Sequence, residues 1–154
     1  MRLGVVGANI EDLNDRTGQL RSKEESVQRI KSAAAAARAA GVPDFVINAR
    51  TDVIGEGGTV EEAINRAKAF LDAGATTAFV WGGGTRGLRD AEVEQITKAL
   101  DGRLSVVLPA SAAEGFLTVS EVKKIGIARV SIGPRLQVDA AKTMKRSIQD
   151  LLSS

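Results

Sequence analysis

The sequence contains no cysteine and no histidine, and these two absences remove several kinds of chemistry. Without cysteine there is neither a disulfide framework nor a thiolate nucleophile, and without histidine there is no imidazole base. A zinc-finger site needs these same residues. Acid–base chemistry must therefore come from carboxylates, lysine or bound water, and a bound metal ion would need oxygen ligands.

Aromatic residues, charge of one sign and long apolar runs are also scarce. Aromatics make up 3% of the chain and the formal net charge is +2. A protein with few stacking platforms and no basic field is not expected to bind nucleic acid. No apolar run reaches the roughly 18 residues of a membrane span, and the apolar start leads directly into Asn9 and Glu11, which does not resemble a signal peptide. We therefore expect a cytoplasmic protein with no nucleic-acid or membrane partner.

Short apolar segments alternate with amphipathic helix patterns along the whole chain. Predicted strands occupy residues 4–12, 45–49, 78–81, 104–108 and 128–132. Ser22, Thr59 and Thr118 are each followed three residues later by a glutamate, the capping-box signature of a helix start. We expect Asp90 to cap a further helix, Gly133-Pro134 to begin the last one, and residues 13–21 to form a polar loop. In the last helix the expected buried stripe consists of Ala141, Met144, Ile148 and Leu151.

Strict strand–helix alternation predicts a parallel sheet with right-handed crossovers, and 154 residues suit a single domain, 1–154. An open doubly wound sheet and part of a (β/α)8 barrel both fit this pattern. The G-x-G-x-x-G of a nucleotide-binding first turn is missing, as is a Walker-type loop. These absences favour an α/β fold of about five βα units in a partial (β/α)8 TIM barrel, because a complete barrel has eight strands.

Polar residues gather at the predicted carboxyl ends of the strands, which in parallel barrels form the functional rim. In chain order they are Glu11, Asp12, Asn48, Arg50, Asp52, the Gly82–Thr85 loop, Ser111, Ser131, Gly133 and Arg135. A carboxylate beside an arginine suits an anionic substrate held with a hard cation such as Mg²⁺, although rim ion pairs are also purely structural in many proteins.

Backbone amides offer a second kind of binding group at this rim. Amides exposed by Gly82 and Gly83, or by Gly133 at a helix start, could bind a phosphate or carboxylate, and equally these glycines could serve only as turns. Trp81 is expected to pack at the rim or at a subunit contact.

Five motifs in order resemble the isocitrate lyase/phosphoenolpyruvate mutase superfamily. The segment Gly7–Asp12 (GANIED) is similar to the family's G-x-x-I-E-D at the fourth barrel strand, and Asn48–Asp52 (NARTD) to the A-R-T-D of the fifth. Residues 73–80 and 106–108 resemble the sixth and seventh strands, and Arg129–Pro134 (RVSIGP) the R-V-S-x-G-P of the eighth. The resemblance covers nearly the whole chain with its order and spacing preserved.

This resemblance implies a Mg²⁺-dependent lyase or mutase, with Mn²⁺ as the alternative metal. Family members act on C–C or P–C bonds of α-keto acids or phosphonates through an enolate-like pyruvate species. Carried over, Glu11 belongs to the carboxylate shell of the metal, and Arg50 binds the substrate and stabilises oxyanion charge. Both are expected to be catalytic. Asn48, Gly82, Gly83, Ser131 and Gly133 complete the expected substrate-binding set.

The sequence also departs from the family pattern. The resemblance begins at the fourth strand, so the domain is expected to lack the first three βα units, which in the family carry the anchoring acidic pair. Residues 13–20 lack the Lys-x-Cys-Gly-His loop of the lyase branches, which counts against isocitrate or methylisocitrate lyase activity. We therefore expect this chain alone to be weakly active or inactive.

Two alternatives to an enzyme stay open at this stage. The chain could be a non-catalytic truncated family member or assembly module, because open sheet edges favour pairing and hence a homo-oligomer. It could also be an unrelated flavodoxin-like binding domain, because a doubly wound sheet has the same alternation of strands and helices.

Overall fold

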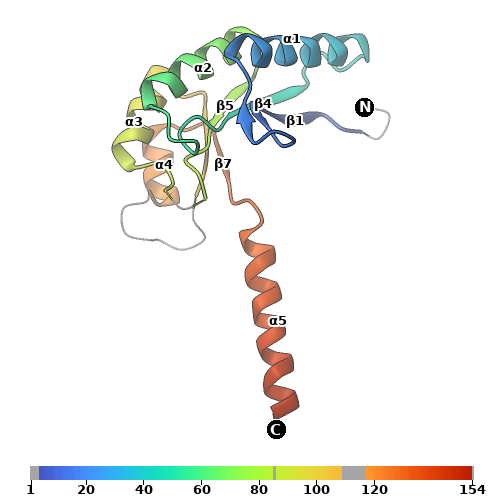
Figure 1. Ribbon diagram of the computed structural model, residues 1–154, viewed down its shortest axis with the longest axis vertical. Helices are drawn as coiled ribbons and strands as arrows, with labels where there is room; N and C mark the ends of the chain where they lie inside the picture. Colours follow the sequence, from blue (N-terminus) through green and yellow to red (C-terminus); the bar gives the residue numbers. More distant parts are fainter. Residues whose placement is uncertain (1–3, 85, 109–116, 154) are drawn as a thin grey trace.

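The computed structural model describes residues 4–84, 86–108 and 117–153. Its centre is a curled parallel sheet covered on its outer side by helices (Figure 1). The strands, in chain order, are β1 (Gly7–Glu11), β4 (Val46–Thr51), β5 (Thr77–Val80), β6 (Leu104–Val107) and β7 (Arg129–Ser131). The predicted strands are therefore all present, with Trp81 and Leu108 lying just beyond the ends of β5 and β6.

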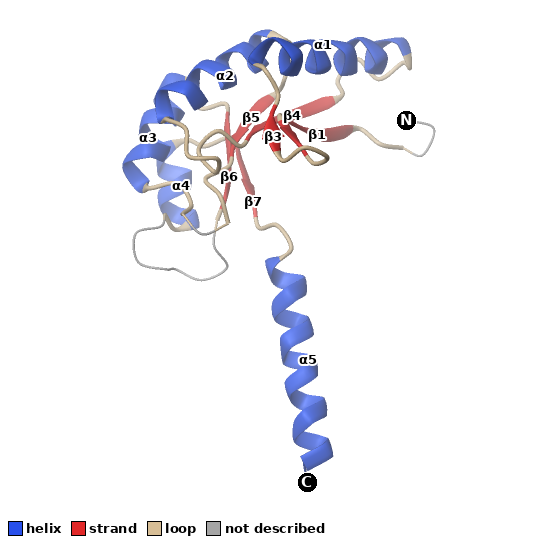
Figure 2. Ribbon diagram, in the orientation of Figure 1, coloured by secondary structure: helices blue, strands red, loops and turns tan. Residues whose placement is uncertain are grey.

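The sheet order is β1-β4-β5-β6-β7, and every neighbouring pair is parallel. Each strand thus adds beside the one before it, as in a barrel, whereas a flavodoxin-like sheet reverses direction in the order 2-1-3-4-5. The flavodoxin-like alternative is therefore wrong. The curled sheet with its outer helices is part of a (β/α)8 barrel, as the sequence predicted (Figure 2).

Helices follow the strands, and their starts agree with the predicted caps. They are α1 (Lys23–Ala39), α2 (Val60–Asp72), α3 (Asp90–Ala99), α4 (Val119–Ile125) and α5 (Arg135–Ser153). The hydroxyls of Ser22, Thr59 and Thr118 accept the expected backbone N–H three residues on. The prediction for α3 was off by one residue: Arg89 is its N-cap, and Glu92 caps the Arg89 N–H.

Alternation along each strand divides the sheet into two faces. Ile47 and Ala49 of β4 and Ala78 and Val80 of β5 point to the helices and belong to one buried apolar core. The next residues along the same strands point to the other side, which we call the concave face. In register across it lie Glu11, Arg50, Phe79, Ser105 and Arg129.

Residues 13–21 are not a simple polar loop. They form a small antiparallel hairpin of β2 (Leu13–Asn14) and β3 (Gln19–Leu20) that sits beside the carboxyl end of β1. Two-residue strands carry too little pattern for the sequence to indicate them. The Arg21 N–H closes the hairpin by donating to the Asp12 carbonyl at 2.9 Å.

Helix α5 contradicts the predicted buried stripe. It extends away from the sheet (Figure 1), so that Met144 and Ile148 are exposed rather than buried, as are Ala141 and Leu151. The amphipathic pattern was read correctly as a helix, but its apolar side has no sheet beneath it. Within the described part of the chain, no helix combines the length and apolar character needed to cross a membrane.

Candidate functional site

Glu11 and Arg50 lie side by side at the carboxyl ends of β1 and β4. They are register partners in the parallel pair, which places both side chains on the concave face. Arg50 Nη2 lies 3.2 Å from Glu11 Oε1. The predicted convergence of a carboxylate and an arginine on one rim is therefore observed.

Asp52, the first residue beyond β4, fixes the Arg50 guanidinium. Arg50 Nε donates to Asp52 Oδ1 at 2.5 Å and Nη2 donates to Oδ2 at 2.8 Å, a bidentate pair in which the Asp52 side chain is fully buried. Such fork-to-fork pairs are shorter and stronger than single neutral hydrogen bonds. Burial of the guanidinium lowers the pKa of Arg50, but the hydrogen bonds and charge of Asp52, together with the charge of Glu11, outweigh this effect and leave the pKa raised.

Two aromatic rings cover the same guanidinium. Arg50 Cζ lies 4.4 Å from the centroid of the Trp81 ring and 5.5 Å from that of Phe79, within the range of a cation–π contact. Among the described residues, no hydrogen bond is made by Arg50 Nη1. Asp52, Glu11 and the two aromatic rings thus hold the Arg50 guanidinium in place, and the N–H groups of Nη1 remain to donate to an anion.

The pKa of Glu11 lies well above that of an ordinary glutamate. Burial, together with the adjacent Asp52 carboxyl, raises its pKa to about 7, against an opposing effect of Arg50. One guanidinium thus faces two carboxylates, and the three groups carry an excess of one negative charge when all are ionised. A group that titrates near neutral pH at a rim is a candidate for proton transfer or cation binding.

The raised pKa of Glu11 predicts a specific pH dependence of stability. The folded chain binds this proton more tightly than the unfolded chain, where the pKa is near 4.5, so the unfolding free energy should fall as pH rises from about 4.5 to 7. Urea unfolding in metal-free buffer at several pH values measures this dependence. In Glu11→Gln the fall should be smaller, and an unchanged slope in that variant would contradict the assignment.

The described residues contain no group of three or more acidic side chains arranged to hold a metal ion. Glu11 nevertheless offers a partly exposed carboxylate, and the buried Asp52 carboxylate adds negative charge behind it, which suits one side of a Mg²⁺ site. Mg²⁺ in proteins commonly keeps several waters and takes only one or two carboxylates. The donor set therefore fits part of such a site, with Glu11 as the more accessible ligand.

Asn48, an expected substrate-binding residue, belongs to a polar row within the sheet. It lies one layer below Arg50, only 1% exposed, and its amide is engaged on both sides. Nδ2 donates to Asn9 Oδ1 at 2.9 Å, and Oδ1 accepts from the Thr77 hydroxyl at 2.7 Å. This polar row links three neighbouring strands, and a role for Asn48 in binding stays a prediction.

The glycine loop after β5 lines a separate cavity of about 460 Å³. Gly82 and Gly83 share it with Trp81 and with Ile132 and Pro134 beyond β7. We call Arg50 with Glu11, Asp52 and Trp81 the Arg50 cluster. Because the Trp81 ring both stacks on Arg50 and lines this cavity, the cavity lies next to the cluster.

Gly82 has a steric reason to be glycine. A Cβ at this position would lie 2.2 Å from the backbone carbon of Gly87, which is far inside contact distance. Gly82→Ala is therefore expected to lower the unfolding free energy by about 1–3 kcal/mol. Gly84→Ala is the matched control, since a Cβ there meets no atom of the described residues within 4 Å, and equal losses in urea unfolding would contradict the packing argument.

The last two predicted binding residues lie at the other end of the rim. Ser131 ends β7 and is half-buried, and Gly133 is exposed with a φ of 62° in the turn before α5. Neither contacts the Arg50 cluster through a hydrogen bond between described residues. Thr85 and Ser111 lie outside the described residues.

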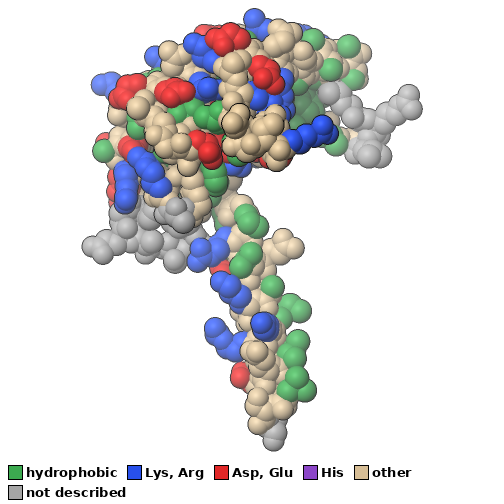
Figure 3. Space-filling view, viewed as in Figure 1, with side chains coloured by type: hydrophobic (Ala, Val, Ile, Leu, Met, Phe, Trp, Pro, Cys, Tyr) green, Lys and Arg blue, Asp and Glu red, His purple; other side chains and the backbone are tan. Residues whose placement is uncertain are grey.

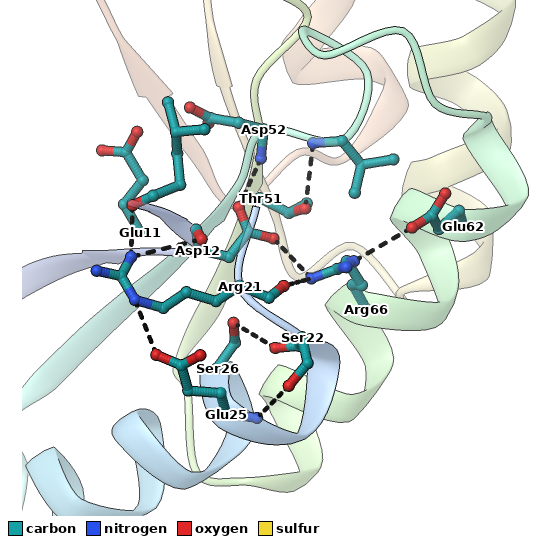
Figure 4. Close-up of polar contacts among 12 residues, drawn as sticks. Glu11, Asp12, Arg21, Ser22, Glu25, Ser26, Thr51, Asp52, Glu62 and Arg66 are labelled. Carbon is teal, nitrogen blue, oxygen red and sulfur yellow. Dashed lines mark hydrogen bonds and ion pairs between the residues drawn. The ribbon is translucent and has the colours of Figure 1, made fainter. Parts of the chain in front are cut away.

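Arg66 on α2 was missed by the sequence reasoning. Only 9% exposed, it lies on the buried side of α2 with Ala63, Ala67 and Phe70. An arginine inside an apolar helical stripe indicates a buried acidic partner. The partner is Asp12, whose carboxylate is 3.3 Å from Arg66 Nη1 (Figure 4).

Comparisons with known proteins identify the family of this chain. The family model described as phosphoenolpyruvate phosphomutase matches residues 1–152. The 2-methylisocitrate lyase of Escherichia coli (strain K12) is 42% identical over 86 residues, which cover 51% of this chain and 28% of that protein.

Two solved structures superpose on nearly all of the chain. For 2,3-dimethylmalate lyase, a member of the PEP mutase/isocitrate lyase superfamily, the TM-score is 0.83 with 27% identity, covering 97% of this chain and 51% of that one. For oxaloacetate acetylhydrolase in complex with its product oxalate, the TM-score is 0.81 with 28% identity, covering 97% and 51%. The chain thus spans about half the length of these structures. With the family model matched along almost its whole length, the chain belongs to the phosphoenolpyruvate phosphomutase family, within the PEP mutase/isocitrate lyase superfamily.

Proposed function

We propose that this chain forms the part of a lyase- or mutase-type site that binds the carboxylate or phosphonate of an α-keto acid. The reaction class is cleavage, formation or rearrangement of a C–C or P–C bond through an enolate-like pyruvate species. One observation carries the proposal: a guanidinium at the barrel rim held by Asp52, paired with Glu11 and stacked on Trp81. A preorganised cation of this kind costs little reorganisation when negative charge develops nearby.

Arg50 is assigned both to substrate binding and to stabilising the enolate oxygen. Its planar fork matches carboxylate or phosphonate oxygens, which is the geometry that favours arginine over lysine. Nη1, which has no hydrogen-bond partner among the described residues, is the donor most available to the substrate. Gly82, Gly83, Ser131, Gly133 and Asn48 stay in the proposal as further substrate-binding residues.

Mg²⁺, or Mn²⁺ in its place, is the proposed cofactor, and Glu11 is the residue assigned to hold it, with Asp52 behind. When bound, such an ion supplies positive charge beside the oxygens of the substrate. Without it, Glu11 takes up a proton near neutral pH, because its pKa is about 7. Glu11 is thus the group of this chain that couples cation binding to proton release.

The names of the relatives support small carboxylic acids as the substrate class of this proposal. One is named for 2-methylisocitrate, one for 2,3-dimethylmalate, and one for oxaloacetate with oxalate as its product. All of these ligands are small polycarboxylates. Because residues 13–20 lack the Cys and His of the lyase loop, we favour the mutase- or hydrolase-like branch over methylisocitrate lyase.

Oxalate binding tests the proposed function. Calorimetric titration with oxalate is expected to give saturable one-site binding in the presence of Mg²⁺, weaker binding without it, and loss of the Mg²⁺ dependence in Glu11→Gln. Absence of binding by the wild-type chain under both conditions would contradict a working site. It would favour the alternative, a non-catalytic family member or assembly module.

We also propose that residues 1–154 act as a single cytoplasmic domain, that the chain alone is weakly active or inactive, and that it forms a homo-oligomer. Exposed apolar side chains line one side of α5 (Figure 3), and they support the last point. Met144 and Ile148 recur at helical spacing and expose 65% and 55% of their surface. Apolar side chains repeated along one helix are typical of protein–protein contacts.

Light scattering after size exclusion checks the oligomer. The wild-type chain is expected above the monomer mass, and Met144→Glu combined with Ile148→Glu is expected at the monomer mass. Thr143→Glu combined with Gln149→Glu adds the same two charges to exposed polar positions away from the Met144 and Ile148 face of α5 and should leave the oligomer intact. A monomeric wild-type chain would contradict the proposal.

A further inference from the structure

Arg66 and Asp12 form a buried ion pair directly beneath the rim. Arg66 Nη1 lies 3.3 Å from Asp12 Oδ2 and also donates to the Arg21 carbonyl at 2.9 Å, while the Asp12 side chain is 1% exposed (Figure 4). The pair connects helix α2 to the end of β1 and to the hairpin that follows it. Neither residue belongs to the set assigned above to substrate or metal.

The other carboxylate oxygen of Asp12 connects the ion pair to the proposed site. Oδ1 accepts the backbone N–H of Asp52 at 2.9 Å, and the Asp52 carboxylate in turn makes the bidentate pair with Arg50. Three contacts therefore run from Arg66 through Asp12 and Asp52 to the Arg50 guanidinium. Figure 4 shows Asp12 pointing from β1 to both the Asp52 N–H and Arg66.

We propose that Arg66 and Asp12 form a bracket that sets the position of Asp52 and, through it, the position of Arg50. Arg66 is thus a positioning residue for substrate binding, an inference that rests on the proposed function of Arg50. The residue after a strand end is free to turn in several directions, and a charged acceptor beneath its N–H removes that freedom. Residues that orient metal ligands from behind typically change metal affinity or activity about 10–100-fold, and we expect a comparable effect for a residue that orients Arg50.

A stabilising role alone does not account for this arrangement. Buried ion pairs usually add little to the unfolding free energy, because replacing both charges by apolar residues of similar size is often neutral or stabilising. Here the carboxylate divides its two oxygens between Arg66 and one backbone N–H at the proposed site. An apolar replacement would fill the same space without directing Asp52.

Removing both charges together separates positioning from stability. The double variant Asp12→Leu with Arg66→Met leaves no unpaired buried charge, so it is expected to fold while the bracket is absent. Trp81 is the single tryptophan of the chain and stacks on Arg50, so its fluorescence reports the guanidinium without any ligand. We expect acrylamide quenching of Trp81 to rise and oxalate affinity to fall about tenfold.

Three comparisons make the test specific. Glu62→Gln loosens only the 3.5 Å contact of Arg66 with a half-exposed carboxylate and should leave both readouts unchanged. Arg66→Lys alone keeps the positive charge beside Asp12, so its Trp81 quenching should lie between that of the wild-type chain and that of the double variant. In an Arg50→Met background, the double variant should change neither readout further, because its effect passes through Arg50.

The outcomes distinguish this inference from the proposed function. A folded double variant with wild-type Trp81 quenching would overturn the bracket, whatever the oxalate result. An equal change of quenching in the Arg50→Met background would overturn it as well. If the wild-type chain binds no oxalate, the proposed function fails, while the Trp81 readout still decides the bracket.

Discussion

Arg50→Lys is expected to weaken oxalate binding about 100-fold, although the substitution keeps the positive charge. Lysine cannot make the bidentate pair with Asp52 or stack on Trp81, so its ammonium would not be held at the rim. Hydrogen bonds to charged groups contribute about 1.5–3 kcal/mol, which corresponds to roughly 10–150-fold in affinity. Calorimetry with oxalate and Mg²⁺ measures the change.

Arg86→Lys is the matched control for this prediction. Arg86 also pairs with a carboxylate, that of Glu92, but the pair is on the surface near the start of α3. Its replacement should leave oxalate affinity unchanged. Equal affinities of Arg50→Lys and Arg86→Lys would mean that the anion is bound elsewhere.

Arg66→Met alone is expected to lower the unfolding free energy by about 3–5 kcal/mol, because it leaves the Asp12 carboxylate buried without its cation. Burial already raises the pKa of Asp12 despite its hydrogen bonds and the charge of Arg66, so the site tolerates the charged form poorly. Adding Asp12→Leu should recover most of the loss. Urea unfolding of the two single variants and the double variant measures the coupling between them.

Additive losses in that cycle would contradict a paired interaction. The size of the single-variant effect also matters, because an exposed ion pair would contribute only about 0–1 kcal/mol. A small loss in Arg66→Met would mean that the Asp12 carboxylate reaches water or another donor in solution.

Local sequence patterns were sufficient to predict the framework. The apolar strand segments and the capping hydroxyls of Ser22, Thr59 and Thr118 depend only on neighbouring residues in the sequence, so they indicated the strands of the main sheet and the helix starts correctly. Parallel alternation then brought Glu11 and Arg50 to one rim. These inferences need only short-range geometry and the handedness of βα crossovers.

Contacts between distant residues could not be predicted in the same way. Arg66 meets Asp12 across 54 positions, and only the charged residue within an apolar stripe of α2 hinted at it. The hydrogen bonds of Asn48 with the amide of Asn9 and the hydroxyl of Thr77 were likewise not indicated by the sequence. The apolar stripe of α5 was expected to be buried, but it is exposed. The sequence pattern indicates that a helix is amphipathic and does not indicate whether another surface covers its apolar side.

The most direct test is a crystal structure of the chain with Mg²⁺ and oxalate. The proposal predicts an oxalate carboxylate hydrogen-bonded to Arg50 and a cation in contact, directly or through water, with Glu11. Asp52 should still accept the N–H groups of Arg50, and its own backbone N–H should still donate to Asp12. Oxalate bound away from Arg50, with the pairs to Glu11 and Asp52 undisturbed, would contradict the central claim that this rim is the substrate site.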